Sequence, residues 1–192
     1  MTAPRVILGI AGASGAALGL SVAQQLAKLG AEIDLVTSAA AERTLAEECG
    51  ATAYDELRSL ATRCHDNTNI GASIASGSVP VAGMIVAPCS MRTLAAIAHG
   101  LDDNLLTRSA GVQLKERRRL VLLAREAPLT LAHLRNMTAA TEMGAIVLPP
   151  VPAFYLNPQS VAEIVTQIAA RAIDLLGVSE PQANRWDDTA TA

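Results

Sequence analysis

A glycine-rich turn, Gly12-Ala13-Ser14-Gly15, follows a β-branched apolar run that ends at Ile10. Glycine permits positive φ and close approach of the backbone to a ligand, and a helix start presents unpaired N–H groups that attract phosphate. The hydroxyl of Ser14 adds a further donor. The turn lacks the Gly-Lys-Ser/Thr end of a P-loop and the spacing of the dinucleotide-binding GxGxxG motif. From the residues alone it is either a phosphate site or a tight turn required by packing.

A second turn, rich in hydroxyl side chains, runs from Pro88 to Thr93 after an apolar run at 81–87. Parallel sheets bind ligands beyond the carboxyl ends of their strands, so this turn and the first are expected to converge. For Ser90 the alternative is an ordinary cap of the following helix. Cys89 shows no accompanying histidine and aspartate that would indicate a nucleophile, and a small buried thiol is the better interpretation.

Charged side chains form a third group of candidates. Arg125 and Glu126 follow an apolar run at 120–124, again at the carboxyl end of an expected strand. Arg108 and Lys115 belong to an expected helix before that strand. The alternative for all of them is a surface ion pair, which contributes little to stability. The same alternative holds for two further cations: Arg171, and Arg185 beside Trp186.

Composition limits the classes of function. The 192 residues are 51% hydrophobic and 2% aromatic, so the core must be built from alanine, leucine, valine and isoleucine. Such a core buries little apolar area per residue, and we expect a homo-oligomer whose interface adds to it. The net charge of -3 gives no general attraction for nucleic acid or a membrane surface, although the run 115–119 is basic and is either a solvated helix end or a binding surface.

Cysteine usage favours a cytoplasmic protein. The three cysteines form no CxxC pair, and with the three histidines they show no metal-ligand spacing, so neither a disulfide framework nor a metal site is expected. Residues 6–23 resemble a signal peptide in outline, but four glycines would weaken an apolar helix there. We interpret this segment as a strand, a turn and a helix start, and we expect no membrane span.

The order of apolar runs predicts the fold. We expect a single domain over 1–192, with 177–192 as a C-terminal tail that carries Trp186. Strands that alternate with helices indicate a parallel sheet covered by helices, whereas the mixed, polar residues 50–73 give no clear element. The expected strands are 5–10, 31–36, 81–87, 120–124 and 145–148, and the expected helices are 16–29, 39–49, 90–99, 105–115, 129–143 and 157–176.

Six short motifs together resemble the UbiX-type flavin prenyltransferases in order and spacing. They are GIAGASG at 9–15, IASGS at 74–78, PCSMRTL at 88–94, LKERR at 114–118, REAPL at 125–129 and PPVPAFY at 149–155. The resemblance spans residues 6 to 186. It implies an α/β protein of the flavodoxin-like or Rossmann-like class, a three-layer sandwich with a mostly parallel sheet, which assembles as a homo-oligomer and, by family resemblance, as a dodecamer.

The resemblance also implies an activity. Such a protein transfers the dimethylallyl group of dimethylallyl phosphate to reduced FMN, without a metal. The product, prenylated FMN, is the cofactor of UbiD-type decarboxylases, which would receive it. Matched by motif, the FMN contacts would be Gly12, Ala13, Ser14, Ser38, Ser90, Met91, Arg92, Thr93 and Arg125. The phosphate of the prenyl substrate would meet Lys115, Tyr155 and Arg171, with Arg108 and Trp186 nearby.

The chemistry of the transfer gives these residues roles. Cleavage of an allylic C–O bond leaves a dispersed cation and a phosphate, and Lys115, Tyr155 and Arg171 would stabilise the negative charge on that phosphate. The protein would otherwise align two substrates and exclude water. We expect Ser14 and Glu48 to position the proton on the flavin N5, and Glu126 or the released phosphate to transfer protons. The expected catalytic residues are therefore Ser14, Glu48, Lys115 and Glu126.

The sequence departs from the family pattern at several positions. An aspartate common in the family is replaced by Gly111, and another by Gly50 after Glu48. Leu18 and Val79 stand where aromatic residues are usual. The phosphate loops are intact, so these changes bear on the prenyl pocket, the oligomer contacts and the catalytic rate.

Two other functions fit parts of the pattern. One is an FMN-dependent decarboxylase of peptidyl cysteine, but such enzymes use a histidine in the first helix region, and the first histidine here is His65. They also carry asparagine where this chain has Arg92. The other is a non-catalytic FMN-binding subunit of a phenolic-acid decarboxylase. Retention of Lys115, Glu126 and Tyr155, together with Arg171, favours catalysis over that alternative.

Overall fold

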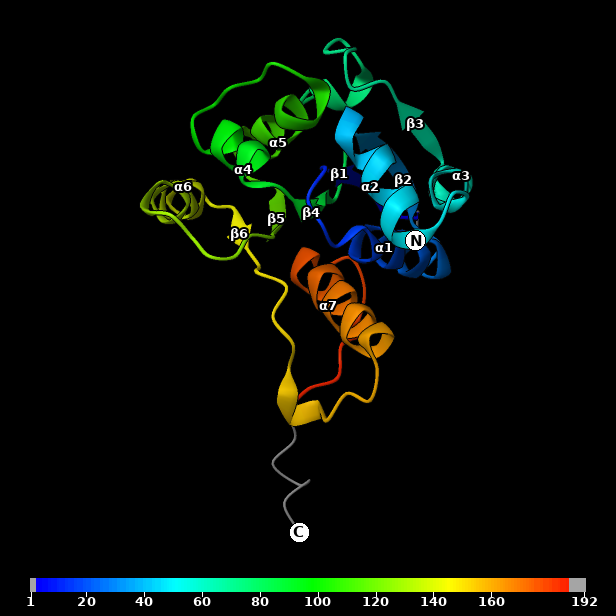
Figure 1. Ribbon diagram of the computed structural model, residues 1–192. Coiled ribbons are helices and arrows are strands. Elements are labelled where there is room, and N and C mark those ends of the chain that lie inside the picture. Colours follow the sequence, from blue (N-terminus) through cyan, green and yellow to red (C-terminus); the bar gives the residue numbers. More distant parts are fainter. Residues whose placement is uncertain (1–2, 187–192) are drawn as a thin grey trace.

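The apolar, β-branched runs of the sequence form the strands of one sheet in the computed structural model, which describes residues 3–186 (Figure 1). Its six strands are all parallel, in the order β3-β2-β1-β4-β5-β6. Central β1 is in register with both neighbours, Val6 pairing with Ile33 on one side and Gly83 on the other. The strands are β1 (Arg5–Ile10), β2 (Glu32–Thr37), β3 (Arg63–His65), β4 (Gly83–Cys89), β5 (Arg119–Ala124) and β6 (Ile146–Val147).

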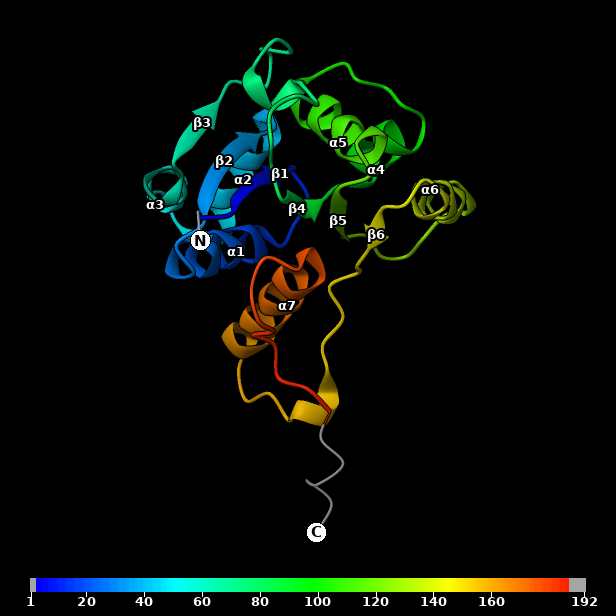
Figure 2. The ribbon, with the colours of Figure 1, turned by 180° about the vertical axis from the view of Figure 1, so that it is seen from behind.

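Helices cover both faces of this sheet, because alternate strand residues are apolar on both sides. Val6 and Leu8 belong to a core with α1, α2, α3 and α7, whereas Ile7 belongs to a second core with α4, α5 and α6. Figures 1 and 2 both show the sheet between the two layers, with α4 and α5 above it and α1 and α7 below it. The expected three-layer α/β sandwich is confirmed. The helices are α1 (Ala16–Lys28), α2 (Ala39–Cys49), α3 (Ala53–Leu60), α4 (Met91–Ala98), α5 (Leu105–Lys115), α6 (Leu131–Glu142) and α7 (Val161–Leu176).

The amino-terminal apolar segment forms β1, the glycine-rich turn and α1, as the strand, turn and helix interpretation predicted. Val6, Leu8 and Val22 within it are fully buried. Over residues 3–186, the structure has no helix that combines the length and apolarity needed to cross a membrane.

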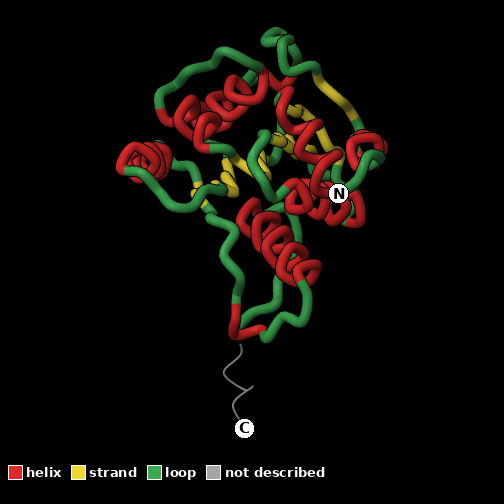
Figure 3. Tube along the Cα trace, viewed as in Figure 1, coloured by secondary structure: helices red, strands yellow, loops and turns green. Residues whose placement is uncertain are grey.

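Two parts of the chain differ from the prediction. The last helix begins at Val161 rather than at Asn157, because Ser160 caps it by accepting a hydrogen bond from the Glu163 N–H at 3.2 Å, and Pro158 lies in the preceding loop. Residues 50–73, which gave no clear element, contain α3 and the short edge strand β3. Figure 3 shows the long loop that runs from β6 to a 3-10 turn, Phe154–Leu156, before α7 returns to the sheet.

The described part of the expected tail, 177–186, runs back along α7. The Asp174 carboxylate accepts from the N–H groups of Gln182 and Ala183 at 2.7 and 3.1 Å. Gln167 and Asn184 exchange two further hydrogen bonds, at 2.9 and 3.0 Å. This segment therefore places Trp186 beside α7, whereas residues 187–192 lie outside the described residues.

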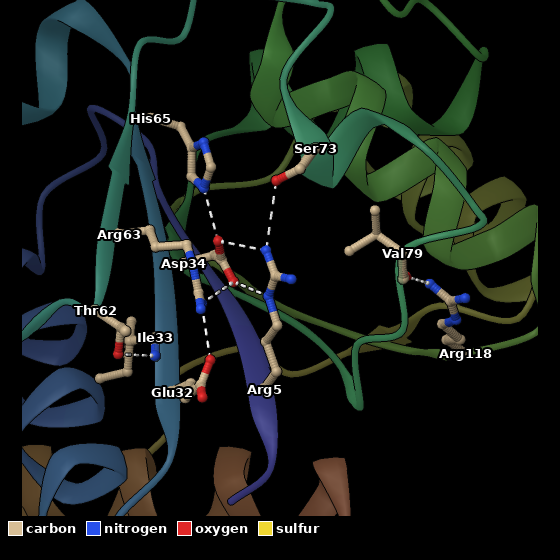
Figure 4. Close-up of polar contacts among 10 residues, drawn as sticks. All are labelled: Arg5, Glu32, Ile33, Asp34, Thr62, Arg63, His65, Ser73, Val79 and Arg118. Carbon is tan, nitrogen blue, oxygen red and sulfur yellow. Dashed lines mark hydrogen bonds and ion pairs between the residues drawn. The ribbon is translucent and has the colours of Figure 1, made fainter.

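A buried carboxylate connects the three strands at one edge of the sheet (Figure 4). Asp34 of β2 is fully buried and accepts from Nε and Nη2 of Arg5 at 2.6 and 3.0 Å. His65 Nε2 lies 2.7 Å from the same carboxylate, and Arg63 Nη1 lies 3.7 Å from it. Burial raises the pKa of Asp34, but the hydrogen bonds from Arg5 and His65 outweigh it, and the net pKa is below its ordinary value.

Candidate active site

A cavity of about 500 Å³ lies where β1, β2 and β4 end, at the carboxyl edge of the sheet. The two turns singled out in the sequence converge there, as expected for a parallel sheet. Among the residues that the structure describes, no carboxylate lines it, and most of its polar side chains can donate hydrogen bonds. Its lining residues are Gly12, Ser38, Ala40, Asn67, Ser90, Arg92, Thr93, Asn104 and Leu106. We call it the loop cavity.

The hydroxyl groups of this cavity differ in how they are used. Ser90 is the cap of α4, its Oγ accepting from the Thr93 N–H at 3.2 Å and donating to Thr93 Oγ1 at 3.0 Å. The Ser38 hydroxyl is buried and has no hydrogen-bond partner among the described residues. A buried polar group without a partner is costly, so Ser38 indicates a ligand with an acceptor atom in this cavity. A phosphate of FMN fits that requirement.

Two N–H groups at the end of the glycine-rich turn are paired within the protein. The N–H groups of Gly15 and Ala16 both donate to Glu48 Oε2, each at 2.8 Å, so a carboxylate of the protein occupies the start of α1. A Cβ at position 12 would overlap that of Ala40, and packing therefore requires Gly12. The N–H groups of Gly15 and Ala16 are therefore already paired, whereas the hydroxyl and amide side chains beside the turn can donate to a phosphate.

Glu48 is held ionised by these contacts. Burial raises its pKa, but hydrogen bonds from Ser14 and the two N–H groups lower it by more, and the charge of Arg125 adds to them. The net pKa is below the ordinary value of a glutamate. Ser14, Glu48 and Arg125 are thus neighbours at the carboxyl edge, which agrees with the grouping that the motifs suggested.

The other carboxyl-edge candidates come from β4 and β5. The Arg125 N–H donates to the Cys89 carbonyl at 3.0 Å, which ties the ends of the two strands together. Glu126 is exposed, and its carboxylate accepts from the Ala127 N–H at 3.0 Å. Met91 is nearly buried. Cys89 is fully buried, and burial raises the pKa of its thiol to about 12, which confirms the buried, unreactive thiol.

A second cavity, of about 410 Å³, lies between α7 and the loop that follows β6. Tyr155, Arg171 and Trp186 all line it, and within residues 3–186 no residue lines both this cavity and the loop cavity. The rings of Tyr155 and Trp186 meet edge to face with their centroids 5.3 Å apart. Tyr155 is 54% exposed and Trp186 63% exposed, so this cavity is open to a second molecule. We call it the aromatic cavity.

Lys115 lies at the amino ends of the parallel strands, which we call the amino edge of the sheet, whereas the loop cavity lies at their carboxyl ends. It ends α5, four residues before β5 begins, and its ammonium group pairs with Glu116 beside Gly77. It lines neither cavity. The chain thus brings together Ser14, Glu48 and Arg125, and separately Tyr155, Arg171 and Trp186, but it leaves Lys115 apart from both groups.

The basic run around Lys115 is largely structural. Arg118 donates to the carbonyls of Gly77 and Val79 at 2.7 and 2.9 Å, the second of which is drawn in Figure 4. Arg119 donates to the Leu175 carbonyl at 2.8 Å. These cations hold loops and helix ends, and the interpretation of the whole run as a free binding surface is not supported.

Comparison with known proteins identifies the family. Residues 1–173 match the Flavoprotein family model. The chain is 52% identical over 186 residues to flavin prenyltransferase UbiX of Neisseria meningitidis, an alignment that covers 97% of this chain and 98% of the relative. The chain belongs to the UbiX flavin prenyltransferase family. As a member of this family it is a flavoprotein enzyme that binds FMN.

Solved structures of UbiX proteins have the same fold. AnUbiX (PadA1), solved in complex with FMN and dimethylallyl pyrophosphate, is 44% identical with a TM-score of 0.93 and covers 97% of this chain and 98% of its own. A dodecameric FMN-dependent UbiX-like decarboxylase of Escherichia coli O157:H7 is 43% identical with a TM-score of 0.90 and covers 95% and 99%. The FMN-dependent cysteine decarboxylase TvaF is only 17% identical, which shows a shared fold alone.

Gly111, one of the two glycines that depart from the UbiX pattern, has an explanation in this chain. A Cβ at Gly111 would lie 2.9 Å from Asp102 Oδ1, and Asp102 Oδ2 pairs with Arg108 Nη1 at 2.9 Å. The carboxylate of Asp102 therefore lies over position 111 and pairs with the arginine one helical turn earlier. Gly111 leaves the space that Asp102 occupies, and a negative charge remains beside Arg108.

We expect the Gly111→Asp variant to be destabilised by about 1–3 kcal/mol, because its side chain would overlap Asp102 and repel it. In an Asp102→Ala background the same substitution should be tolerated, since an aspartate at 111 can pair with Arg108 at i,i+3. Thermal unfolding at a fixed protein concentration measures both effects, with Gly111→Asn as the uncharged control. Equal destabilisation by Gly111→Asp in the two backgrounds would contradict this account.

Several lining residues were not predicted from the sequence. Asn67 and Asn104 line the loop cavity, and Gln167 and Asn184 line the aromatic cavity. Asn67 falls in the polar segment that gave no clear element. The position of Lys115 could have been predicted, because a residue shortly before a parallel strand lies at the amino edge of the sheet.

Proposed function

We propose that the chain transfers a dimethylallyl group from dimethylallyl phosphate to reduced FMN, at a site that more than one subunit completes. The observation that carries this proposal is the pair of cavities. One is lined by hydroxyl and amide groups, with Ser38 lacking a partner, and suits the phosphate of FMN. The other places Arg171 and Tyr155 where they can bind a second phosphate beside the Trp186 ring.

The proposed transfer assigns each group of side chains one task. Reduced FMN supplies the nucleophilic ring, and the prenyl phosphate supplies the allylic carbon. Arg171 and Tyr155 would stabilise the charge that develops on the departing phosphate. The Tyr155 and Trp186 rings would exclude water from the allylic group. The ionised Glu48 would place a negative charge beside the reacting edge of the flavin and hold the Ser14 hydroxyl in one orientation.

Lys115 enters this scheme only through a neighbouring subunit. Its position at the amino edge separates it from both cavities of its own chain. Exposed apolar side chains provide surfaces on which copies can pack, among them Leu131, Val151, Phe154 and Val161. The dodecameric Escherichia coli relative supports the same assembly for this chain. We propose a dodecamer in which Lys115 of one subunit approaches the prenyl phosphate held by another.

The product and the compartment follow from the same chemistry. We propose that prenylated FMN passes to a UbiD-type decarboxylase, the class of enzyme that uses it as a cofactor. We also propose a cytoplasmic location, because all three cysteines are free thiols in the structure, as a reducing compartment maintains them. AnUbiX holds dimethylallyl pyrophosphate, and a diphosphate donor is the alternative to the monophosphate.

An anaerobic reaction tests the transfer directly. The protein is incubated with reduced FMN and dimethylallyl phosphate, or with the pyrophosphate in a parallel sample, and the flavin is analysed by mass spectrometry. We expect a flavin heavier by one prenyl group with the monophosphate. Flavin that stays unmodified with both donors, while FMN remains bound, would support a non-catalytic FMN-binding subunit instead.

A further inference from the structure

Asn67 occupies an unusual position at the wall of the loop cavity. It lies just after β3, and both of its oxygen atoms are used by the start of α5. Its backbone carbonyl accepts from the Leu105 N–H at 2.8 Å, and its side-chain Oδ1 accepts from the Leu106 N–H at 2.9 Å. The Thr107 N–H donates to Asn104 Oδ1 at 3.1 Å. The first turn of α5 is therefore closed by side chains and backbone, and it offers no N–H group to a ligand.

These contacts determine which way the amide of Asn67 faces. Because Oδ1 accepts from a backbone N–H, the other end of the amide is the Nδ2 group, which carries two donor hydrogens. This group has no hydrogen-bond partner in the described part of the chain. Asn104 is different, since its Nδ2 donates to Asp103 at 2.8 Å. Of the two asparagines in the cavity wall, only Asn67 keeps both of its amide donors available.

The rest of the cavity indicates what these donors bind. Ser38 has a buried hydroxyl without a partner, and the guanidinium of Arg92 lines the same cavity while paired to Asp103 at 2.7 Å. The absence of any lining carboxylate leaves a region of donors that suits an anion. The start of α1 is already occupied by Glu48. We propose that Asn67 binds the phosphate of FMN through Nδ2 while its Oδ1 holds α5 in place.

The Asn67→Asp variant separates the two roles of this side chain. An aspartate keeps the acceptor for the Leu106 N–H, and its charge is favourable at a helix start, so the melting temperature should be unchanged or higher. The same change removes both donors and adds a negative charge beside the phosphate. We expect the FMN dissociation constant to rise about 10- to 100-fold. Riboflavin, which has no phosphate, should lose less than about threefold.

Asn69→Asp is the matched control. Asn69 lies in the same loop, and its Oδ1 likewise accepts from a backbone N–H, that of Gly71 at 3.2 Å, but it does not line the cavity. We expect this variant to bind FMN within about threefold of the parent, because a solvent-exposed charge is screened. Any larger effect of Asn67→Asp then arises from the cavity position and not from added charge in the loop.

The measurement is a titration of the apoprotein with FMN and with riboflavin, followed by quenching of flavin fluorescence, together with thermal unfolding of each variant. Equal losses for FMN and riboflavin, or FMN binding by Asn67→Asp equal to that of Asn69→Asp, would overturn the phosphate contact. The test needs FMN binding but no turnover. An inactive parent that binds FMN would therefore contradict the proposed transfer without affecting this inference.

Discussion

Oligomers assembled from equal amounts of Lys115→Met and Glu48→Gln chains are expected to regain about a quarter of the parent activity, because each site draws the two residues from different subunits at random. Each variant alone should lose about 100-fold or more in turnover, since each lacks one charged group that acts on the reacting centre. The physical basis is the placement of Glu48 and Lys115 at opposite edges of the sheet.

Coexpression with two different affinity tags, followed by purification on both, yields the mixed oligomers, and prenylated FMN is measured by mass spectrometry. A chain that carries both substitutions, coexpressed with the parent, is the matched control and should show a similar fraction. If mixed single variants stay as inactive as the separate ones, both residues must serve a site within one chain, and the shared site is wrong.

The Asp34→Asn variant is expected to lose about 3 kcal/mol of unfolding free energy, because it removes the charge of a buried carboxylate on which the partly buried Arg5 and His65 converge. Asp34 is fully buried, and Arg5, Arg63 and His65 all face it. The control is Glu32→Gln, which removes a half-exposed partner of Arg63 and should cost less than about 1 kcal/mol. Thermal unfolding at one protein concentration compares them, and equal losses would contradict a special role for Asp34.

The same carboxylate predicts a pH dependence. Its folded pKa is below the ordinary value of 3.8, so folding favours the ionised form and binds fewer protons than the unfolded chain does. The stabilisation is complete above that ordinary value and is lost as the pH falls through the lower folded value. Between pH 5 and pH 3, the melting temperature of the parent should therefore fall more steeply than that of the Asp34→Asn variant, measured at constant ionic strength. Parallel curves would exclude this contribution.

The sequence predicted the central elements well because their signals are local. β1, β4 and β5 are continuous apolar runs, as buried parallel strands require, and α5 was predicted with both of its ends. The edge strand β3 escaped prediction because Arg63 and Cys64 are exposed and its three residues carry no apolar pattern. The Asn157-Pro158 pair predicted too early a start for α7, which begins after Ser160 because that residue caps the helix.

The site was predictable in its residue types but not in its arrangement. Hydroxyl-rich turns after strands indicated the loop cavity, because strand ends of a parallel sheet converge. The contact of Glu48 with Gly15 joins residues 33 positions apart, and no local pattern encodes the return of α2 to the start of α1. Asn67 has the same character, since its role depends on α5, which begins 38 positions later.

Under the proposed function, the carboxylate at the start of α1 favours one orientation of the flavin nucleotide. Two places at this edge of the sheet would otherwise attract an anion, the backbone N–H groups of Gly15 and Ala16 and the donors around Ser38. Glu48 fills the first and repels phosphate from it, so we expect the phosphate of the proposed nucleotide at the second. A nucleotide whose phosphate approached Gly15 and Ala16 would meet the negative charge of Glu48. One whose phosphate approached Ser38 would not. We therefore expect Glu48 to orient the nucleotide as it binds, before any reaction begins.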